Sequence, residues 1–177
     1  MPKVVDHGRA RAAIIERAGR LFIERGYTRI GMREVAAAAR IPKSTLYHYF
    51  ATKEALFAEV GATWLHEEVR QIEAATRGLA SPSARVRAAL GWLVAHEREL
   101  LAGTVVMLEA ATGQGAALMW QSHRAYVNAV ARLLGISVSQ TRKLLVTLIG
   151  AVVLRQIDGG QLDLKEVGKW LTATKKG

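Results

Sequence analysis

Apolar residues recur along most of this chain at the three- and four-residue spacing of an amphipathic α-helix. In the first such stretch, from about Gly8 to Arg25, the residues Ile14, Ala18 and Phe22 fall on one face. Gly26 follows, and glycine readily adopts the left-handed conformation that ends a helix. Alternating runs of β-branched residues, which are typical of strands, are hard to find. The pattern therefore predicts an all-α fold.

Two short helices are predicted after the first one, with a tight break between them. They cover about Met32–Ala39 and residues 43–50, and Pro42 stands at the start of the second, where its missing N–H does no harm. Leu46 and Phe50 are spaced to anchor the second helix, whose other residues carry ammonium, hydroxyl and imidazole groups that suit base edges and phosphates. This arrangement is typical of a DNA-binding helix-turn-helix. A solvated amphipathic helix with its aromatic rings packed inside is the alternative.

The stretch from about Ala10 to Val60 resembles the N-terminal domain of the tetracycline-repressor (TetR) family of transcriptional regulators. The resemblance rests on Arg25-Gly26-Tyr27, Met32-Arg33-Glu34-Val35-Ala36, the run Lys43 to Phe50, and Lys53-Glu54-Ala55-Leu56. It implies a homodimer whose N-terminal domain binds DNA and whose larger helical domain binds a small effector that releases the DNA. The residues predicted at or beside the DNA are Arg33, Lys43, Ser44, Thr45, Tyr47, His48, Tyr49 and Lys53.

The chain departs from the family pattern at three places. Ile30-Gly31 stands where Thr or Ser is common, and Gly31 caps the second helix only weakly because it has no hydroxyl. Arg40 replaces the usual turn glycine, so we expect it to adopt a positive φ at some energetic cost, with a phosphate contact as the compensating gain. Pro42 replaces a capping Ser.

A long helix is predicted from Thr52, whose hydroxyl is placed to cap it, to about Thr76. We therefore expect a helix-turn-helix DNA-binding domain at residues 1–52 and a helical effector-binding and dimerisation domain at residues 53–177. The further helices predicted in the second domain cover about Ser81–Gly103, Ala116–Leu134, Val138–Ile157 and Leu162–Leu171. A turn is predicted at Thr112–Gly115 and a frayed tail at Lys175–Gly177.

The stretch from Leu144 to Leu154 is apolar nearly all round, and such a helix must be covered on both faces. One cover is the rest of the domain, and the same helix of a second subunit would supply the other. The residues predicted at this two-fold interface are Leu144, Thr147, Leu148, Gly150, Ala151 and Leu154. Burial of the helix entirely within one chain is the alternative.

An effector pocket should be mostly apolar with a few polar groups. The residues of the second domain that fit this description are Trp64, Trp92, His96, Met107, Glu109, Met119, Trp120, His123 and Tyr126. Each of them also suits ordinary core packing. A buried Glu109 would favour a cationic ligand, and the alternatives for its carboxylate are a pair with Arg124 or exposure to water.

The balance of charge supports a polyanionic partner. The chain has 25 Lys and Arg against 15 Asp and Glu, a net charge of +10, and its first 55 residues hold 11 and 5 of these. Such a field attracts nucleic acid. With the homodimer that the resemblance implies, we expect double-stranded operator DNA of roughly palindromic sequence as the partner. A helical protein that binds a membrane surface is the alternative, weakened by Glu16 and Glu24 on the polar face of the first helix.

Other classes of protein find little support in the sequence. It has no Cys, the fragment Gly113-Gln114-Gly115 is too short for a phosphate-binding loop, and no Gly-x-Ser-x-Gly elbow occurs. We expect neither an enzyme nor a bound metal or cofactor. The run from Leu144 to Leu154 is shorter than the roughly 18 residues of a membrane span. The prediction is a cytoplasmic repressor that responds to a small molecule; a regulator without such an effector is the alternative.

Overall fold

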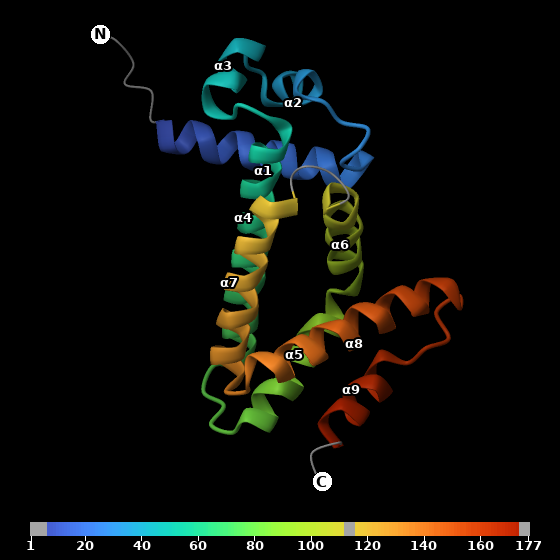
Figure 1. The fold of residues 1–177 in the computed structure, drawn as a ribbon. Helices are drawn as coiled ribbons and strands as arrows, with labels where there is room; N and C mark the ends of the chain where they lie inside the picture. The colour runs from blue at the N-terminus through green and yellow to red at the C-terminus, as the bar shows by residue number, and fades with distance from the viewer. Residues whose placement is uncertain (1–6, 112–115, 174–177) are drawn as a thin grey trace. The chain divides into compact units, whose positions relative to one another are not determined.

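The computed structural model describes residues 7–111 and 116–173, which form nine α-helices and no strand. The helices are α1 (His7–Arg25), α2 (Met32–Ala39), α3 (Lys43–Tyr49), α4 (Lys53–Thr76), α5 (Pro82–Ala95), α6 (Glu97–Ala111), α7 (Ala116–Leu134), α8 (Val138–Ile157) and α9 (Leu164–Ala173) (Figure 1). The predicted all-α class is confirmed. The turn predicted at Thr112–Gly115 and the tail predicted at Lys175–Gly177 lie outside the described residues.

The chain divides into two compact units. The first unit consists of Met1–Trp64 and Gly103–Ser122, and the second unit of Leu65–Ala102 and His123–Gly177. The first unit is larger than the domain predicted at residues 1–52, because the beginning of α4 and a segment from α6 and α7 pack with it. Such a segment, distant in sequence, cannot be assigned from helical spacing alone.

Aromatic packing between α1 and α4 forms the core of the first unit. The Phe57 ring lies 5.3 Å from that of Phe22, nearly perpendicular to it, and 4.8 Å from that of Tyr27. Phe22 and Phe57 are almost completely buried, and burying such a ring contributes about 1.5–3 kcal/mol. Ile14 and Ala18 are buried on the same face of α1, as predicted. The helix α2 packs against α1 and α3 against α2 (Figure 1).

The helix predicted from Ser81 to Gly103 is wrong in its length. The structure ends α5 at Ala95 and starts α6 at Glu97. Between them, His96 leaves the helical conformation with φ −113° and ψ 25°, and its Nδ1 hydrogen-bonds the Trp92 carbonyl oxygen at 2.8 Å. Apolar residues keep their helical spacing through this point, so the pattern does not reveal the break.

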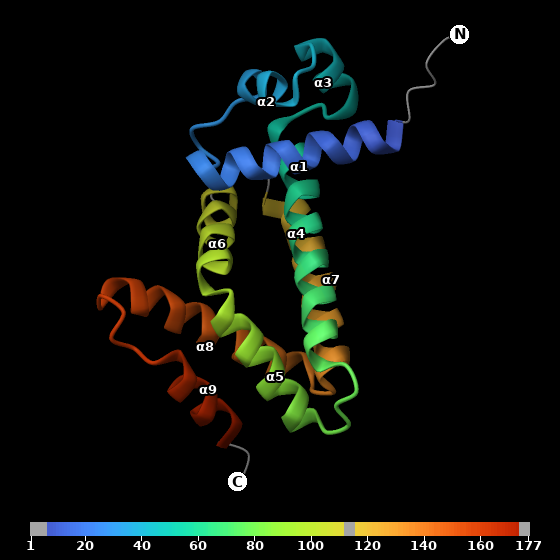
Figure 2. The ribbon, with the colours of Figure 1, turned by 180° about the vertical axis from the view of Figure 1, so that it is seen from behind.

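The core of the second unit gathers apolar residues from several helices. It includes Ile72 of α4, Leu90 of α5, Val127 of α7, and Leu144 and Leu148 of α8. The short helix α9 packs against α5 and α8 (Figure 2). Residues of separate segments thus supply one core, so the helices of this unit depend on one another.

A polar pair is built into this second unit. The Tyr126 hydroxyl of α7 donates a hydrogen bond to the Glu68 carboxylate of α4. Burial raises the pKa of the Glu68 carboxyl above its ordinary value, and the Tyr126 hydrogen bond opposes part of this change. Burial, with the nearby Glu68 carboxylate, also raises the pKa of Tyr126. The ionised form of Glu68 therefore costs stability in the folded protein.

Replacing Glu68 by Gln should change how stability depends on pH. Folding raises the pKa of Glu68. Its contribution to the free energy of unfolding is therefore fully present below the unfolded-state pKa of 4.5 and is lost as pH rises through the folded-state pKa. The amide side chain of Glu68→Gln keeps an acceptor for Tyr126 without the charge. Relative to this variant, the wild type should lose free energy of unfolding as pH rises from about 4 to 7, at most about 1.4 kcal/mol for each step of one in pH. Urea unfolding at several pH values measures this difference.

Glu67→Gln is the matched control. Glu67 is the exposed neighbour of Glu68 on α4, and hydrogen bonds from Gln71 and Arg70 lower its pKa. Its contribution is present above the unfolded pKa and is lost as pH falls, so the control should show the opposite trend. Parallel stability curves for the wild type and Glu68→Gln would contradict the prediction.

Candidate nucleic-acid interface

The turn between α2 and α3 is closed by the backbone at Arg40. This residue adopts φ 55° and ψ 43°, the only positive φ outside glycine among the described residues. Its N–H donates to the Ala37 carbonyl at 3.0 Å, and the Ile41 N–H donates to the Ala36 carbonyl at 3.1 Å. The positive φ predicted for Arg40 is confirmed, and the left-handed conformation costs a residue with a Cβ about 1–2 kcal/mol.

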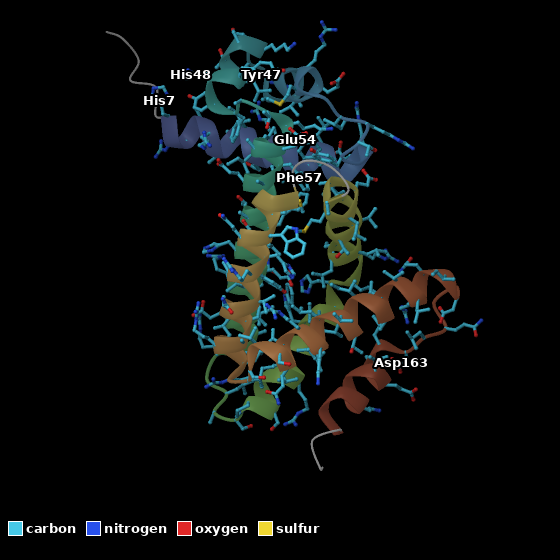
Figure 3. The ribbon with its side chains drawn as sticks, viewed as in Figure 1. His7, Tyr47, His48, Glu54, Phe57 and Asp163 are labelled. Carbon is cyan, nitrogen blue, oxygen red and sulfur yellow. The ribbon has the colours of Figure 1, made fainter. Side chains whose placement is uncertain are left out.

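The helix α3 buries its apolar anchors and exposes most of its polar side chains. Leu46 is 0% and Phe50 2% exposed, which confirms both as anchors. Pro42 precedes the helix with φ −58° and gives no side-chain cap. The predicted DNA-facing residues on α3 that are exposed are Lys43, Ser44, Tyr47 and His48, while Thr45 and Tyr49 are half-buried. Figure 3 marks Tyr47 and His48 on this helix.

Exposed cations accompany this polar face. Arg33 of α2, Arg40 in the turn and Lys43 of α3 are all exposed. The Lys43 ammonium lies 5.5 Å from the centre of the Tyr47 ring, a distance at which the ring face attracts a cation. Gly31 stands at the N-terminal cap of α2 and supplies no side-chain hydrogen bond there, so the cap is weak, as predicted. Helix, turn and helix together carry the charge that a phosphate backbone requires.

Lys53, predicted at the DNA, has a structural role that the sequence did not reveal. Its ammonium donates to the carbonyl oxygens of Tyr27 at 3.1 Å and Ile30 at 3.0 Å. It also lies 4.0 Å from the centre of the Tyr27 ring. These contacts fasten the first residue of α4 to the α1–α2 turn. An ammonium has three N–H donors, so contact of the third with a phosphate stays a prediction.

Arg11 holds the end of α3 in place, and sequence reasoning missed it. Its guanidinium donates to both carboxylate oxygens of Glu59 on α4 and to the Tyr49 carbonyl oxygen at 2.8 Å. It also covers the Phe50 ring at 4.3 Å. The hydrogen-bond partners are 38 and 48 residues away, so no local pattern signals the contact. One α1 side chain thereby positions the end of α3 and the residue that follows it.

The predicted effector residues are divided between the two units, so neither unit contains the whole set. Trp64, Met107, Glu109 and Met119 belong to the first unit, and Trp92, His96, His123 and Tyr126 to the second. In the first unit Met119 is a core residue, with Trp64 and Met107 packed against the core. In the second unit the Trp92 and His96 rings stack with their centres 4.7 Å apart, and the centres of the His123 and Tyr126 rings lie 6.1 Å apart.

Two of the effector candidates have surroundings that differ from the expectation. The Glu109 carboxylate accepts hydrogen bonds from the Thr28 N–H at 3.1 Å and the Thr28 hydroxyl at 3.4 Å, a partner not considered from the sequence. Trp120 is 73% exposed. Met119 therefore packs in the core, whereas Trp120 lies at the surface.

The helix α8 is buried on one face only. Of the predicted interface residues, Leu144, Leu148 and Ala151 are buried within the chain, Thr147 is half-buried, and Gly150 and Leu154 are exposed. Packing within the chain therefore accounts for the burial of three of the six positions, and a two-fold interface on this helix stays a prediction. The large apolar side chains exposed on this helix are Val146, Ile149, Val153, Leu154 and Ile157.

Two other kinds of site find little support among the described residues. No three or more His, Cys, Asp or Glu side chains there are grouped so that they could hold a metal ion. No single described helix is both long and apolar enough to cross a membrane. Segments of α7 and α8 pass that test of length and composition only as a pair, bent by 105°.

The fold and the exposed face of α3 define a helix-turn-helix protein. Residues 14–60 match the family model described as "Bacterial regulatory proteins, tetR family". The helix-turn-helix domain therefore matches the tetR family model, as the resemblance in the sequence implied. The HTH-type transcriptional repressor DhaR of Mycobacterium sp. (strain GP1) is 29% identical over 75 residues, which cover 42% of this chain and 38% of DhaR. The match thus spans less than two fifths of that relative.

Solved structures share the helical architecture well beyond the matched domain. FadR of Bacillus subtilis, in complex with stearoyl-CoA, superposes with a TM-score of 0.69 at 17% identity, covering 92% of this chain and 95% of FadR. The multidrug binding protein EbrR, complexed with imidazole, gives a TM-score of 0.73 at 23% identity, covering 98% and 93%. At these identities the likeness establishes the fold alone.

Arg40→Gly should separate backbone strain from charge. Glycine adopts φ 55° without steric cost, so we expect the variant to gain about 0.5–1 kcal/mol in free energy of unfolding even though its unfolded chain is more flexible. Arg40→Ala is the matched control, since it loses the same charge and keeps the strain. Urea unfolding of both variants measures the effect, and equal stabilities would contradict it.

Proposed function

We propose that this protein is a transcriptional repressor that occupies an operator in double-stranded DNA. The observation that carries the proposal is the geometry of α3. Leu46 and Phe50 anchor the helix while Lys43, Tyr47 and His48 remain exposed. This helix lies within residues 14–60, which match the tetR family model. The net charge of +10 has the sign that DNA binding requires.

Different side chains would position the protein and read the sequence. Arg33, Arg40 and Lys43 are exposed cations that suit phosphates, whose contacts fix register but carry no sequence information. The hydroxyls of Thr45 and Tyr47 suit hydrogen bonds to base edges in the major groove. In this proposal these residues bind DNA and take part in no catalytic step. The proposed location is the cytoplasm, where a bacterial regulator meets the chromosome.

The salt dependence of binding tests the proposal. An operator selected from random duplex DNA by the full chain provides the probe, and fluorescence anisotropy measures its affinity. If the cations neutralise phosphates, the logarithm of the affinity should fall linearly with the logarithm of the salt concentration, with a slope of about −0.9 per phosphate. Affinity that does not change with salt would contradict the proposal. Binding to anionic vesicles without binding to DNA would favour the membrane-surface alternative.

Tyr47→Phe and Tyr47→Ala examine sequence reading with the same probe. If the hydroxyl reads a base edge, both variants should reduce the preference for operator over random DNA by about 1–3 kcal/mol. Lys43→Ala should instead weaken binding to all sequences about equally. An unchanged preference in Tyr47→Phe would assign the hydroxyl no reading role.

We further propose that the protein is a homodimer joined through the exposed face of α8. Val146, Ile149, Leu154 and Ile157 form apolar surface there, and Ile157 is 77% exposed. Gly150 lies among them, and a Cβ at this position would have no neighbouring atom within 4 Å, so a second helix could approach closely. A two-fold dimer would present two α3 helices to successive major grooves, which agrees with a palindromic operator.

Gly150→Asp should abolish the dimer without unfolding the subunit. Position 150 is open in the isolated chain, so an Asp there is solvated until a second subunit buries its charge, at a cost of several kcal/mol. Sedimentation should show a folded monomer that has lost operator affinity. Gly150→Ala, which adds no charge, is the control and should remain dimeric. A dimeric Gly150→Asp protein would place the interface elsewhere.

We also propose that the second unit binds a small-molecule effector that releases the operator. The solved structures of FadR with stearoyl-CoA and EbrR with imidazole support a helical domain of this architecture as a ligand-binding one. Within the second unit, the candidates from the sequence that offer aromatic surface and polar atoms are Trp92, His96, His123 and Tyr126. Glu68, which accepts a hydrogen bond from the Tyr126 hydroxyl, is a further candidate for contact with the effector.

A further inference from the structure

A carboxylate from α6 lies against the turn that precedes the helix-turn-helix. Glu109 accepts a hydrogen bond from the Thr28 N–H at 3.1 Å and one from the Thr28 hydroxyl at 3.4 Å. The two residues are 81 positions apart and both belong to the first unit. Hydrogen bonds to a charged acceptor are roughly twice as strong as those between neutral groups. The contact therefore links α6 firmly to the α1–α2 turn.

The turn has the shape that this carboxylate requires. Gly26 ends α1 with φ +84°, and a Cβ at this position would lie 3.1 and 3.2 Å from the two Glu109 oxygens. Those distances are tighter than ordinary van der Waals contact, so any side chain would press on the carboxylate. Gly26 thus serves both the left-handed backbone and the close approach of Glu109.

The same turn is held from α4 by a group of opposite charge. Lys53 binds the carbonyl oxygens of Tyr27 and Ile30, whereas Glu109 binds the amide and the hydroxyl of Thr28. A cation therefore satisfies acceptors of the turn and an anion satisfies its donors. Residue Met32, which begins α2, follows only two positions after Ile30. The conformation of the turn consequently sets where α2 starts.

We propose that Glu109 is a positioning residue for DNA binding, which acts by fixing the α1–α2 turn and through it the placement of α2 and α3. This inference rests on the proposed function. The Glu109 carboxylate has the charge that phosphates repel, so it is not itself a DNA contact. Electrostatics alone therefore predicts that removing the carboxylate strengthens DNA binding, whereas positioning predicts that it weakens binding.

The opposite signs make Glu109→Ala a decisive variant. We expect its operator affinity to fall about tenfold, which corresponds to about 1.4 kcal/mol. Glu109→Gln keeps a side-chain oxygen that can accept from Thr28, so it should recover most of the affinity. Glu99→Ala is the matched control, because Glu99 is an exposed carboxylate on the same helix in the second unit. Its affinity should equal or slightly exceed that of the wild type.

A local measurement separates positioning from general loss of stability. Hydrogen exchange at the Thr28 amide should accelerate in Glu109→Ala and stay slow in Glu99→Ala, while amides in the core of the second unit are unchanged. Thr28→Ala removes the hydroxyl donor and keeps the N–H, so it should weaken binding less than Glu109→Ala. Combining the two changes should cost no more than Glu109→Ala alone, since both act on one contact.

The outcomes distinguish this inference from the proposed function. If the wild type binds no duplex DNA, the proposed function fails. If the wild type binds its operator and Glu109→Ala binds as well as or better than Glu99→Ala, the positioning role of Glu109 is overturned. Should Glu109→Ala fail to fold, Thr28→Ala carries the test, and operator affinity equal to that of the wild type in this folded variant would overturn the inference.

Discussion

The packing of Phe57 against Phe22 and Tyr27 is the interaction on which the DNA-binding part of the structure depends. The Phe22 and Phe57 rings join α1 to α4 in the first unit, and Tyr27 packs against Phe57 beside them. The helix α3 has only seven residues, and isolated helices of that length are marginal in water. Its conformation must come from the scaffold beneath it. Leu46 and Phe50 connect it to that scaffold and leave most of its polar side chains exposed to a partner.

Charged side chains complete what the apolar core begins, by binding backbone groups at the ends of short elements. Arg11 binds the Tyr49 carbonyl at the end of α3, and Lys53 binds two carbonyls of the α1–α2 turn. Glu109 binds an amide of that turn. Backbone groups near helix ends have no partner within their own helix, so long-range side chains of either charge can satisfy them. The basic composition of the domain thus serves structure as well as any attraction to DNA.

The two units of the chain divide the residues that a regulator needs. The first unit holds the helix-turn-helix and the contacts that set its geometry. The second unit holds Trp92, His96, His123 and Tyr126 together with the exposed apolar face of α8. The Glu68 carboxyl, hydrogen-bonded to Tyr126, is buried in the second unit, and this burial raises its pKa. The ionised form of Glu68 is therefore costly to the stability of the second unit.

The sequence by itself determined the local features, because each depends on neighbours a few residues apart. Helical spacing predicted α1, α2, α3 and α8, and the replacement of a turn glycine predicted the positive φ of Arg40. The break at His96 escaped prediction because apolar spacing continues through it. Only the tertiary structure decided which face of α8 is buried, and only it brought Glu109 to Thr28 across 81 residues. Contacts of that kind depend on how separate helices pack, which local periodicity does not encode.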